Sequence, residues 1–153
     1  MNKKLFQLSR IIFAFATVIL VFAATVKAEN PTKWQLLTEQ NGVQVYFRYE
    51  NFDDNVNDIH QQMAVLKFVN TTNQNLSLEW DLEAWYNGVC NACGKKDKEH
   101  HFSTQLNAGE TKTGNFEKRG TQRELLIFSK FNNMENKVVL TKFNLANLKI
   151  SIL

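Results

Sequence analysis

The sequence has 153 residues, of which 44% are hydrophobic and 22% are charged, and its formal net charge is +3. Four of the eighteen basic residues and none of the fifteen acidic residues fall within residues 1–28, so residues 29–153 hold fourteen basic and fifteen acidic residues, a net charge of −1. A nucleic-acid binder that relies on a basic surface is therefore excluded. The remaining length suffices for one domain with a single core.

The first segment, residues 1–28, has the pattern of a cleavable secretory signal peptide. Basic residues precede an apolar run from Ile11 to Ala24, and Val26 and Ala28 stand three and one positions before the expected cut. The run is short for a membrane span of about 20 residues. We therefore predict that residues 29–153 form a single domain that is exported to the periplasm or the extracellular space, with no membrane span after cleavage.

The first predicted strands flank a tight turn. Asn41-Gly42 is a strong signal for a type I′ hairpin turn, because both residues adopt positive φ at low cost. The residues after the turn, Val43 to Tyr49, alternate between apolar and polar or aromatic side chains, which predicts a strand. We expect a strand before the turn as well, with a short helix ending at Gly42 as the alternative. The polar segment from Phe52 to Asp58 is predicted to be a loop.

Two longer strands flank the polar segment Asn70 to Asn75. Ile59 to Val69 carries apolar residues on both faces, which predicts a strand covered on both sides. In Leu76 to Tyr86, apolar and polar residues alternate strictly. This predicts a strand with one apolar face that is buried, the dry face, and one polar face that is exposed to solvent, the wet face. We expect these strands to pair as a hairpin near the centre of one sheet, so that Lys67 and Gln61 face the second strand.

The rest of the chain supplies further short strands. Residues 102–106, 111–116, 125–131 and 138–153 have strand patterns, and a bulge is expected at Asn144 or Asn147 in the last of them. Seven or eight strand segments, one proline and no long amphipathic helix predict an all-β antiparallel sandwich, immunoglobulin-like in the broad sense.

Cys90 and Cys93 form a C-x-x-C motif that has three interpretations. A structural disulfide is expected if the chain is exported to an oxidising compartment. A zinc site is the alternative, because His100 and His101 follow closely and two thiolates with one or two imidazoles suit tetrahedral zinc. A thiol-redox pair is the third interpretation, although the motif lies in a glycine-flanked loop and not at a helix N-terminus.

The wet face of the Leu76–Tyr86 strand is the candidate ligand face. Glu79, Asp81 and Glu83 line it and Trp85 stands at its end, so it is suited to bind a sugar by stacking and hydrogen bonding, or to hold a cation. A merely solvated charged face is the alternative. No nucleophile elbow, phosphate loop or zinc-protease motif is present in the sequence.

We therefore expect a non-enzymatic binding or interaction protein of the cell envelope, without a cofactor, whose partner is a protein or a glycan. The alternative is a zinc-binding or thiol-redox protein centred on the C-x-x-C loop.

Two resemblances accompany these patterns. The segment WQLLTEQNGVQVYFR resembles the start of START-type lipid-binding domains, but the strand-like end VVLTKFNLANLKISIL replaces the long C-terminal helix that such domains need. Over the mature chain, the order of a GV-x-VY hairpin, an N-T-T turn, a W-x-L-x-x-WYNG strand with C-x-x-C, an AGE turn and a final KF-x-L strand resembles small uncharacterised exported proteins of Gram-negative bacteria. That resemblance implies an envelope location and implies no catalytic residues.

Overall fold

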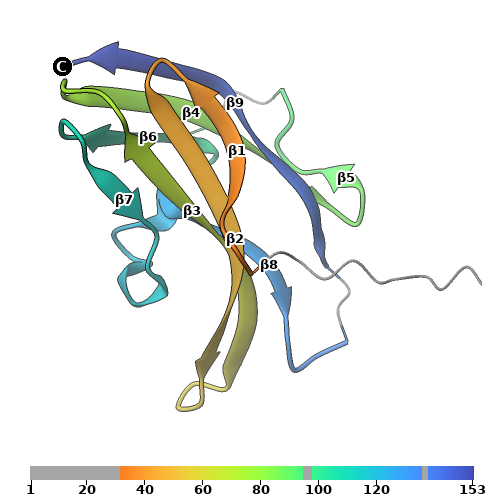
Figure 1. Cartoon of the computed structure of the whole chain (residues 1–153). Helices are drawn as coiled ribbons and strands as arrows, with labels where there is room; N and C mark the ends of the chain where they lie inside the picture. Colours follow the sequence, from red (N-terminus) through yellow and green to blue (C-terminus); the bar gives the residue numbers. More distant parts are fainter. Residues whose placement is uncertain (1–31, 95–97, 136–137) are drawn as a thin grey trace, which may run out of the picture.

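The computed structural model describes residues 32–94, 98–135 and 138–153, so the predicted signal peptide lies outside the described residues. The described part is almost entirely β-structure in two antiparallel sheets that pack face to face (Figure 1). This architecture confirms the predicted all-β sandwich. Within these residues, no helix has the length and apolar character needed to cross a membrane.

The first sheet, sheet A, is built around a long hairpin. Its strands are β1 (Gln35–Gln40), β2 (Val43–Asp54), β3 (Ile59–Asn70), β7 (Thr111–Thr113) and β8 (Leu126–Phe131). β3 pairs with β2 along one edge, and with β7 and β8 at the two ends of its other edge. Two short 3-10 turns, η1 (Phe116–Lys118) and η2 (Arg123–Leu125), connect β7 to β8.

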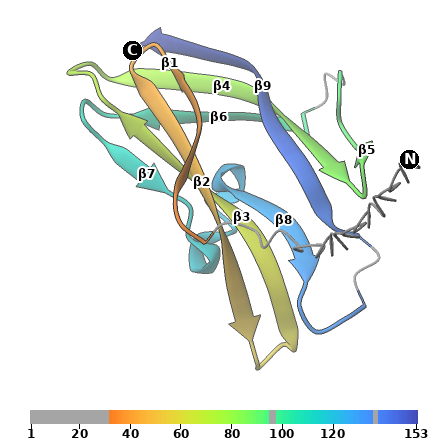
Figure 2. The same ribbon diagram turned by 45° about the vertical axis from the view of Figure 1, so that its right-hand side comes forward.

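The second sheet, sheet B, is built around the strand with the strict alternation. Its strands are β4 (Leu76–Tyr86), β5 (Val89–Cys90), β6 (His101–Leu106) and β9 (Leu140–Ile152). β9 pairs with β4 along nearly its whole length, while β6 and β5 pair with the two ends of the opposite edge. β4 is therefore the central strand of sheet B, as Figure 2 shows from a second direction.

Two tight turns connect β1 to β2 and β2 to β3. Asn41 and Gly42 have φ of 46° and 77°, so the strand-turn-strand prediction is confirmed and the helix alternative is wrong. The predicted loop from Phe52 to Asp58 is only partly correct, because β2 continues to Asp54 in register with β3. Its turn is held as expected, since Asp54 Oδ1 accepts hydrogen bonds from the backbone N–H groups of Val56 and Asn57.

The expected hairpin between β3 and β4 is wrong, because the two strands belong to different sheets. Both edges of β3 are already occupied by other strands of sheet A, and the dry face of β4 covers the inner face of that sheet. Lys67 instead lies over the rings of Trp34 and Tyr46 on the outer face of sheet A, 4.5 Å from each centroid. It and Gln61 therefore do not face β4.

The side chain of Asn70 holds the crossing from β3 to β4. It is 1% exposed, and its Nδ2 donates to the carbonyl oxygens of Gln74 at 2.7 Å and Asn107 at 2.8 Å. Its Oδ1 accepts hydrogen bonds from the backbone N and the Oγ1 of Thr72, at 2.9 Å and 2.7 Å. One buried amide thus joins the β3–β4 connection to the β6–β7 connection. Both its amide nitrogen and its amide oxygen are fully hydrogen-bonded within the protein.

The core between the sheets is centred on Trp80 of β4. Trp80 is 1% exposed, and its ring centroid lies 5.0 Å from that of Phe68 and 6.1 Å from that of Phe102. A second cluster covers the outer face of sheet A, and its buried members are Met63, Val65, Phe116 and Leu126. β3 is therefore covered on both faces, as its sequence predicted.

β9 contains the predicted bulge. Asn147 has a φ of 53°, and the register between β4 and β9 shifts at this point, from Glu79 opposite Lys149 to Asp81 opposite Ala146. The bulge thus lies at Asn147, while Asn144 pairs regularly with Glu83.

The far end of the β2–β3 hairpin extends beyond sheet B in both views (Figures 1 and 2). His60 lies there between two carboxylates, with Nδ1 2.7 Å from Asp53 Oδ1 and Nε2 3.4 Å from Asp58 Oδ1. The hydrogen bond to Asp53, assisted by the charges of Asp53 and Asp58, raises the pKa of His60 above its ordinary value of 6.5.

The Asn70 network predicts a large effect of one small substitution. Asn70→Ala removes four hydrogen bonds of a buried amide and leaves a cavity between the two connections, so we expect the free energy of unfolding to fall by about 2–4 kcal/mol. Urea unfolding followed by circular dichroism measures this change. Thr71→Ala is the control, because Thr71 is exposed and its Oγ1 donates a single hydrogen bond to the Gly42 carbonyl. Equal losses of unfolding free energy in Asn70→Ala and Thr71→Ala would contradict the role of Asn70.

The His60 pair predicts a pH dependence. Because the folded-state pKa of His60 is raised, its protonation stabilises the fold fully at pH values below about 6.5, and this contribution is lost as the pH rises through the folded-state pKa. Asp53→Asn should lower the pKa of His60 towards its ordinary value. NMR titration of the His60 imidazole protons in the wild-type protein and in Asp53→Asn measures the two pKa values of His60. An unchanged His60 titration in Asp53→Asn would contradict the assignment.

Candidate functional site

The wet face of β4 forms the outer face of sheet B. Side chains that are directly opposite one another in antiparallel strands point to the same face, so the register gives rows across three strands. The rows are Gln105–Ser77–Ser151, Ser103–Glu79–Lys149, His101–Asp81–Ala146 and Glu83–Asn144. The fifth row, nearest the β4–β5 turn, is Cys90–Trp85–Lys142. Most side chains of this face therefore carry hydroxyl, amide or charged groups, and one indole stands at its end.

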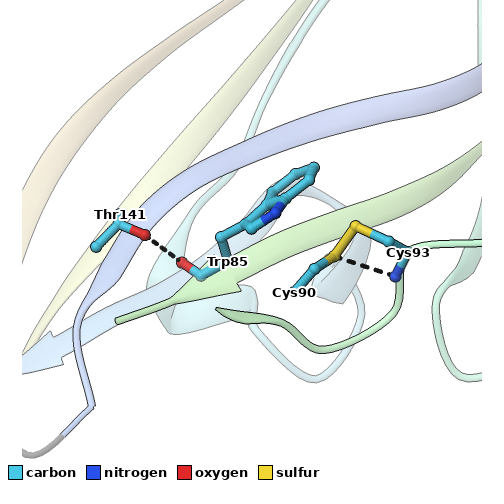
Figure 3. Close-up of a disulfide and its surroundings, with 4 residues drawn as sticks. All are labelled: Trp85, Cys90, Cys93 and Thr141. Atoms are coloured by element: carbon cyan, nitrogen blue, oxygen red, sulfur yellow. Dashed lines mark hydrogen bonds between the residues drawn. A yellow bond between two sulfur atoms is a disulfide. The ribbon is translucent and has the colours of Figure 1, made fainter. Parts of the chain in front are cut away.

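Trp85 is half-buried. It lies near the Cys90–Cys93 disulfide, in the same row as Cys90 (Figure 3). Lys142 Nζ lies 4.4 Å from the centroid of its ring, and Thr141 Oγ1 donates a hydrogen bond to its carbonyl oxygen at 3.1 Å. An exposed cation–π contact of this kind contributes about 0.5–1 kcal/mol. The flexible lysine can therefore be displaced from the ring at low cost.

The carboxylate of Asp81 is held from both neighbouring strands. Its Oδ1 lies 2.8 Å from His101 Nδ1 on β6, and its Oδ2 accepts a 2.7 Å hydrogen bond from Asn147 Nδ2 on β9. The bulge in β9 explains the second contact, because it places Asn147 beside the row in which Asp81 lies. Asp81 thus links all three strands, so the middle of the face is held in place.

The turn after Trp85 is of the hairpin type. Asn87 and Gly88 have φ of 50° and 82°, the conformation of a type I′ turn, and they connect β4 to the two-residue strand β5. Tyr86 anchors this end of β4 to sheet A, because its hydroxyl donates a 2.9 Å hydrogen bond to the Phe128 carbonyl. Burial raises the pKa of Tyr86 above its ordinary value, which keeps the hydroxyl protonated as a donor.

Cys90 and Cys93 form a disulfide, with their Cα atoms 5.8 Å apart. Cys90 lies opposite Trp85 in the β4–β5 ladder, and Cys93 is exposed in the loop that follows. The predicted disulfide is present, and while the two sulfurs are joined they are not thiolates that could bind zinc.

The histidines lie apart from the cysteines. His101 contacts Asp81, four residues along β4 from the Trp85–Cys90 row, which corresponds to about 14 Å. The backbone carbonyl of His100 accepts a hydrogen bond from the N–H of Leu82. Across the part of the chain that the structure describes, no three His, Cys, Asp or Glu side chains form a metal-binding group.

The sequence prediction found the contribution of β4 to the face but missed that of the neighbouring strands. Lys142, Asn147 and Lys149 all come from β9, which follows β4 by more than fifty residues in the chain. The alternation of residues 140–146 did indicate a strand with a polar face. It did not indicate that this face continues that of β4.

No protein-family model matches this chain, and neither a curated protein nor a solved structure is significantly similar to it. The fold and the face together define an all-β sandwich with an open polar sheet face and a disulfide-closed loop at one end of it.

The disulfide closes a ring of four residues, which predicts a modest stabilising effect. In the chain-entropy model so short a ring contributes about 2 kcal/mol. We therefore expect the double variant Cys90→Ser, Cys93→Ser to keep its far-ultraviolet circular dichroism spectrum and to lose about 2 kcal/mol of unfolding free energy in urea. An unfolded double variant would show instead that the fold depends on the disulfide.

Proposed function

We propose that this chain is an exported, non-enzymatic protein of the cell envelope that binds a neutral glycan on the outer face of sheet B. The observation that carries the proposal is the arrangement of Trp85 at the end of several rows of polar side chains. A sugar ring has an apolar C–H face, which an indole covers, and equatorial hydroxyls, which amide, hydroxyl and carboxylate groups bind.

The composition of the face favours a glycan over a protein partner. The buried centre of a protein–protein interface is predominantly apolar and is anchored by several large side chains. Among these rows Trp85 is the single large apolar side chain, and apart from Ala146 and the disulfide-bonded Cys90 the other residues are polar or charged. A ligand that is itself rich in hydroxyl groups matches these rows.

The charges of the face favour a neutral glycan. Glu79, Asp81 and Glu83 form a line of carboxylates along β4, while on β9 Lys149 stands opposite Glu79 and Lys142 stands opposite Trp85. The three carboxylates outnumber the two ammonium groups by one, so the face has little net charge, and the unbroken line of carboxylates along β4 would repel a polyanionic chain.

Export is supported by two observations. The predicted signal peptide precedes the domain, and a disulfide is typical of proteins in oxidising compartments outside the cytosol. Both are consistent with a binding role at the envelope.

The proposal predicts that Trp85 contributes most of the stacking energy. We expect Trp85→Ala to weaken binding of a neutral hexasaccharide about tenfold, which corresponds to about 1.4 kcal/mol, while Lys142→Gln changes it by less than about threefold. Isothermal titration calorimetry with hexose and N-acetylhexosamine hexamers measures both variants, with a hexauronate as the acidic comparison.

Phe131→Ala is the matched control for this experiment. Phe131 is a 39% exposed aromatic residue of sheet A, so its removal should leave binding unchanged. Equal binding by Trp85→Ala and the unchanged protein, or preference for the hexauronate, would contradict the proposed function.

A further inference from the structure

We propose that the Cys90–Cys93 disulfide exchanges with external thiols, and that Cys93 Sγ is the atom they attack. The proposal does not depend on glycan binding, because it rests on the sulfur chemistry of Cys90 and Cys93, although Cys90 also lies in the row of Trp85. The chemical class of the co-reactant is a solvent-accessible thiol, either of a small molecule or of an exported protein.

The exposure of the two sulfur-bearing residues makes the pair asymmetric. Cys93 is exposed in the loop, whereas Cys90 is half-buried in the β4–β5 ladder beside Trp85 (Figure 3). An attacking thiolate has to approach a disulfide sulfur along the S–S axis from outside, so access decides which sulfur is attacked. The exposed Cys93 is the accessible one, and Cys90 is then the leaving group.

The leaving group is stabilised by the loop itself. The backbone N–H of Cys93 donates a hydrogen bond to Cys90 Sγ, with the nitrogen 3.1 Å from the sulfur. When Cys90 leaves as a thiolate, this hydrogen bond becomes charge-assisted and stabilises the leaving group. The loop thus provides the thiolate stabilisation that a helix N-terminus supplies in other redox pairs.

Opening the disulfide does not require the sheet to open. The backbone N–H of Asn91 donates to the Ala84 carbonyl at 3.0 Å, and the side chain of Ala92 is 3% exposed. These contacts, together with the Asn87-Gly88 turn, hold β5 against β4 whether or not the sulfurs are joined. The pair can therefore be reduced in the folded protein.

The exchange takes place in two successive thiolate attacks. An external thiolate bonds to Cys93 Sγ, the Cys90–Cys93 bond breaks, and its electron pair leaves on Cys90 Sγ as a thiolate. A second external thiolate attacks the external sulfur of this mixed disulfide, and Cys93 leaves as a thiolate. Two external thiols are thus oxidised to one disulfide, and the protein disulfide is reduced to a dithiol.

The test uses the oxidised protein purified after export, with reduced glutathione as the probe. Samples are quenched in acid, alkylated and mapped by peptide mass spectrometry. We expect early samples to carry glutathione on Cys93 and the alkyl group on Cys90. Because Cys90 resolves the mixed disulfide, Cys90→Ser treated with oxidised glutathione should accumulate about tenfold more Cys93 adduct than reduced wild-type protein under the same conditions.

A second arm uses a short peptide that contains two cysteines. Its oxidation by one equivalent of protein would support exchange with exported proteins, and reaction with glutathione alone would support exchange with small thiols. A disulfide that resists both probes until denaturant is added, glutathione on Cys90, or no adduct in Cys90→Ser would overturn the proposal. Glycan binding by Trp85→Ala is measured separately, so the failure of one proposal is distinguishable from the failure of the other.

Discussion

The buried amide of Asn70 is the constraint on which the arrangement of this sandwich depends. The chain leaves sheet A at the end of β3 and enters sheet B at Leu76, and the connection has to turn without leaving buried polar groups unpaired. Asn70 satisfies that requirement with four hydrogen bonds, to Thr72, Gln74 and Asn107. The crossing places β4 over the inner face of sheet A, where its apolar residues complete the core.

The alternation of β4 connects the core to the candidate site. The even-numbered residues point into the sandwich, and among them Trp80 is buried with no hydrogen-bond partner for its Nε1. The burial of its large ring outweighs the cost of that unpaired N–H, since a buried tryptophan contributes several kcal/mol when it is compared with alanine. The odd-numbered residues point outward, so the packing that fixes β4 also fixes the positions of Asp81 and Trp85.

The two outer faces of the sandwich are different. The outer face of sheet A carries its own apolar cluster, and Trp34 packs against it with Arg48 and Lys67 over its ring. The outer face of sheet B has polar rows and a single indole. At the Trp85 end of that face, a tight turn and a four-residue disulfide ring lie within one short segment of the chain. The reactive disulfide therefore adjoins the binding surface, and Cys90 belongs to both because it lies in the row of Trp85.

The sequence by itself determined the local features of this protein. Alternation predicted the strands and the faces of β3 and β4, and Asn41-Gly42 predicted the first turn, because side-chain direction in a strand and positive φ in a turn depend on adjacent residues alone. The same signal at Asn87-Gly88 would have predicted the β4–β5 hairpin.

Only the tertiary structure decided which sheet each strand joins, and therefore which side chains share the face with Trp85. A strand with one dry face can pair with several partners of similar pattern, and the choice depends on how the whole core is filled. For this reason the place of β4 in a separate sheet from β3, and the contributions of Lys142 and Asn147 to its wet face, could not be read from the chain.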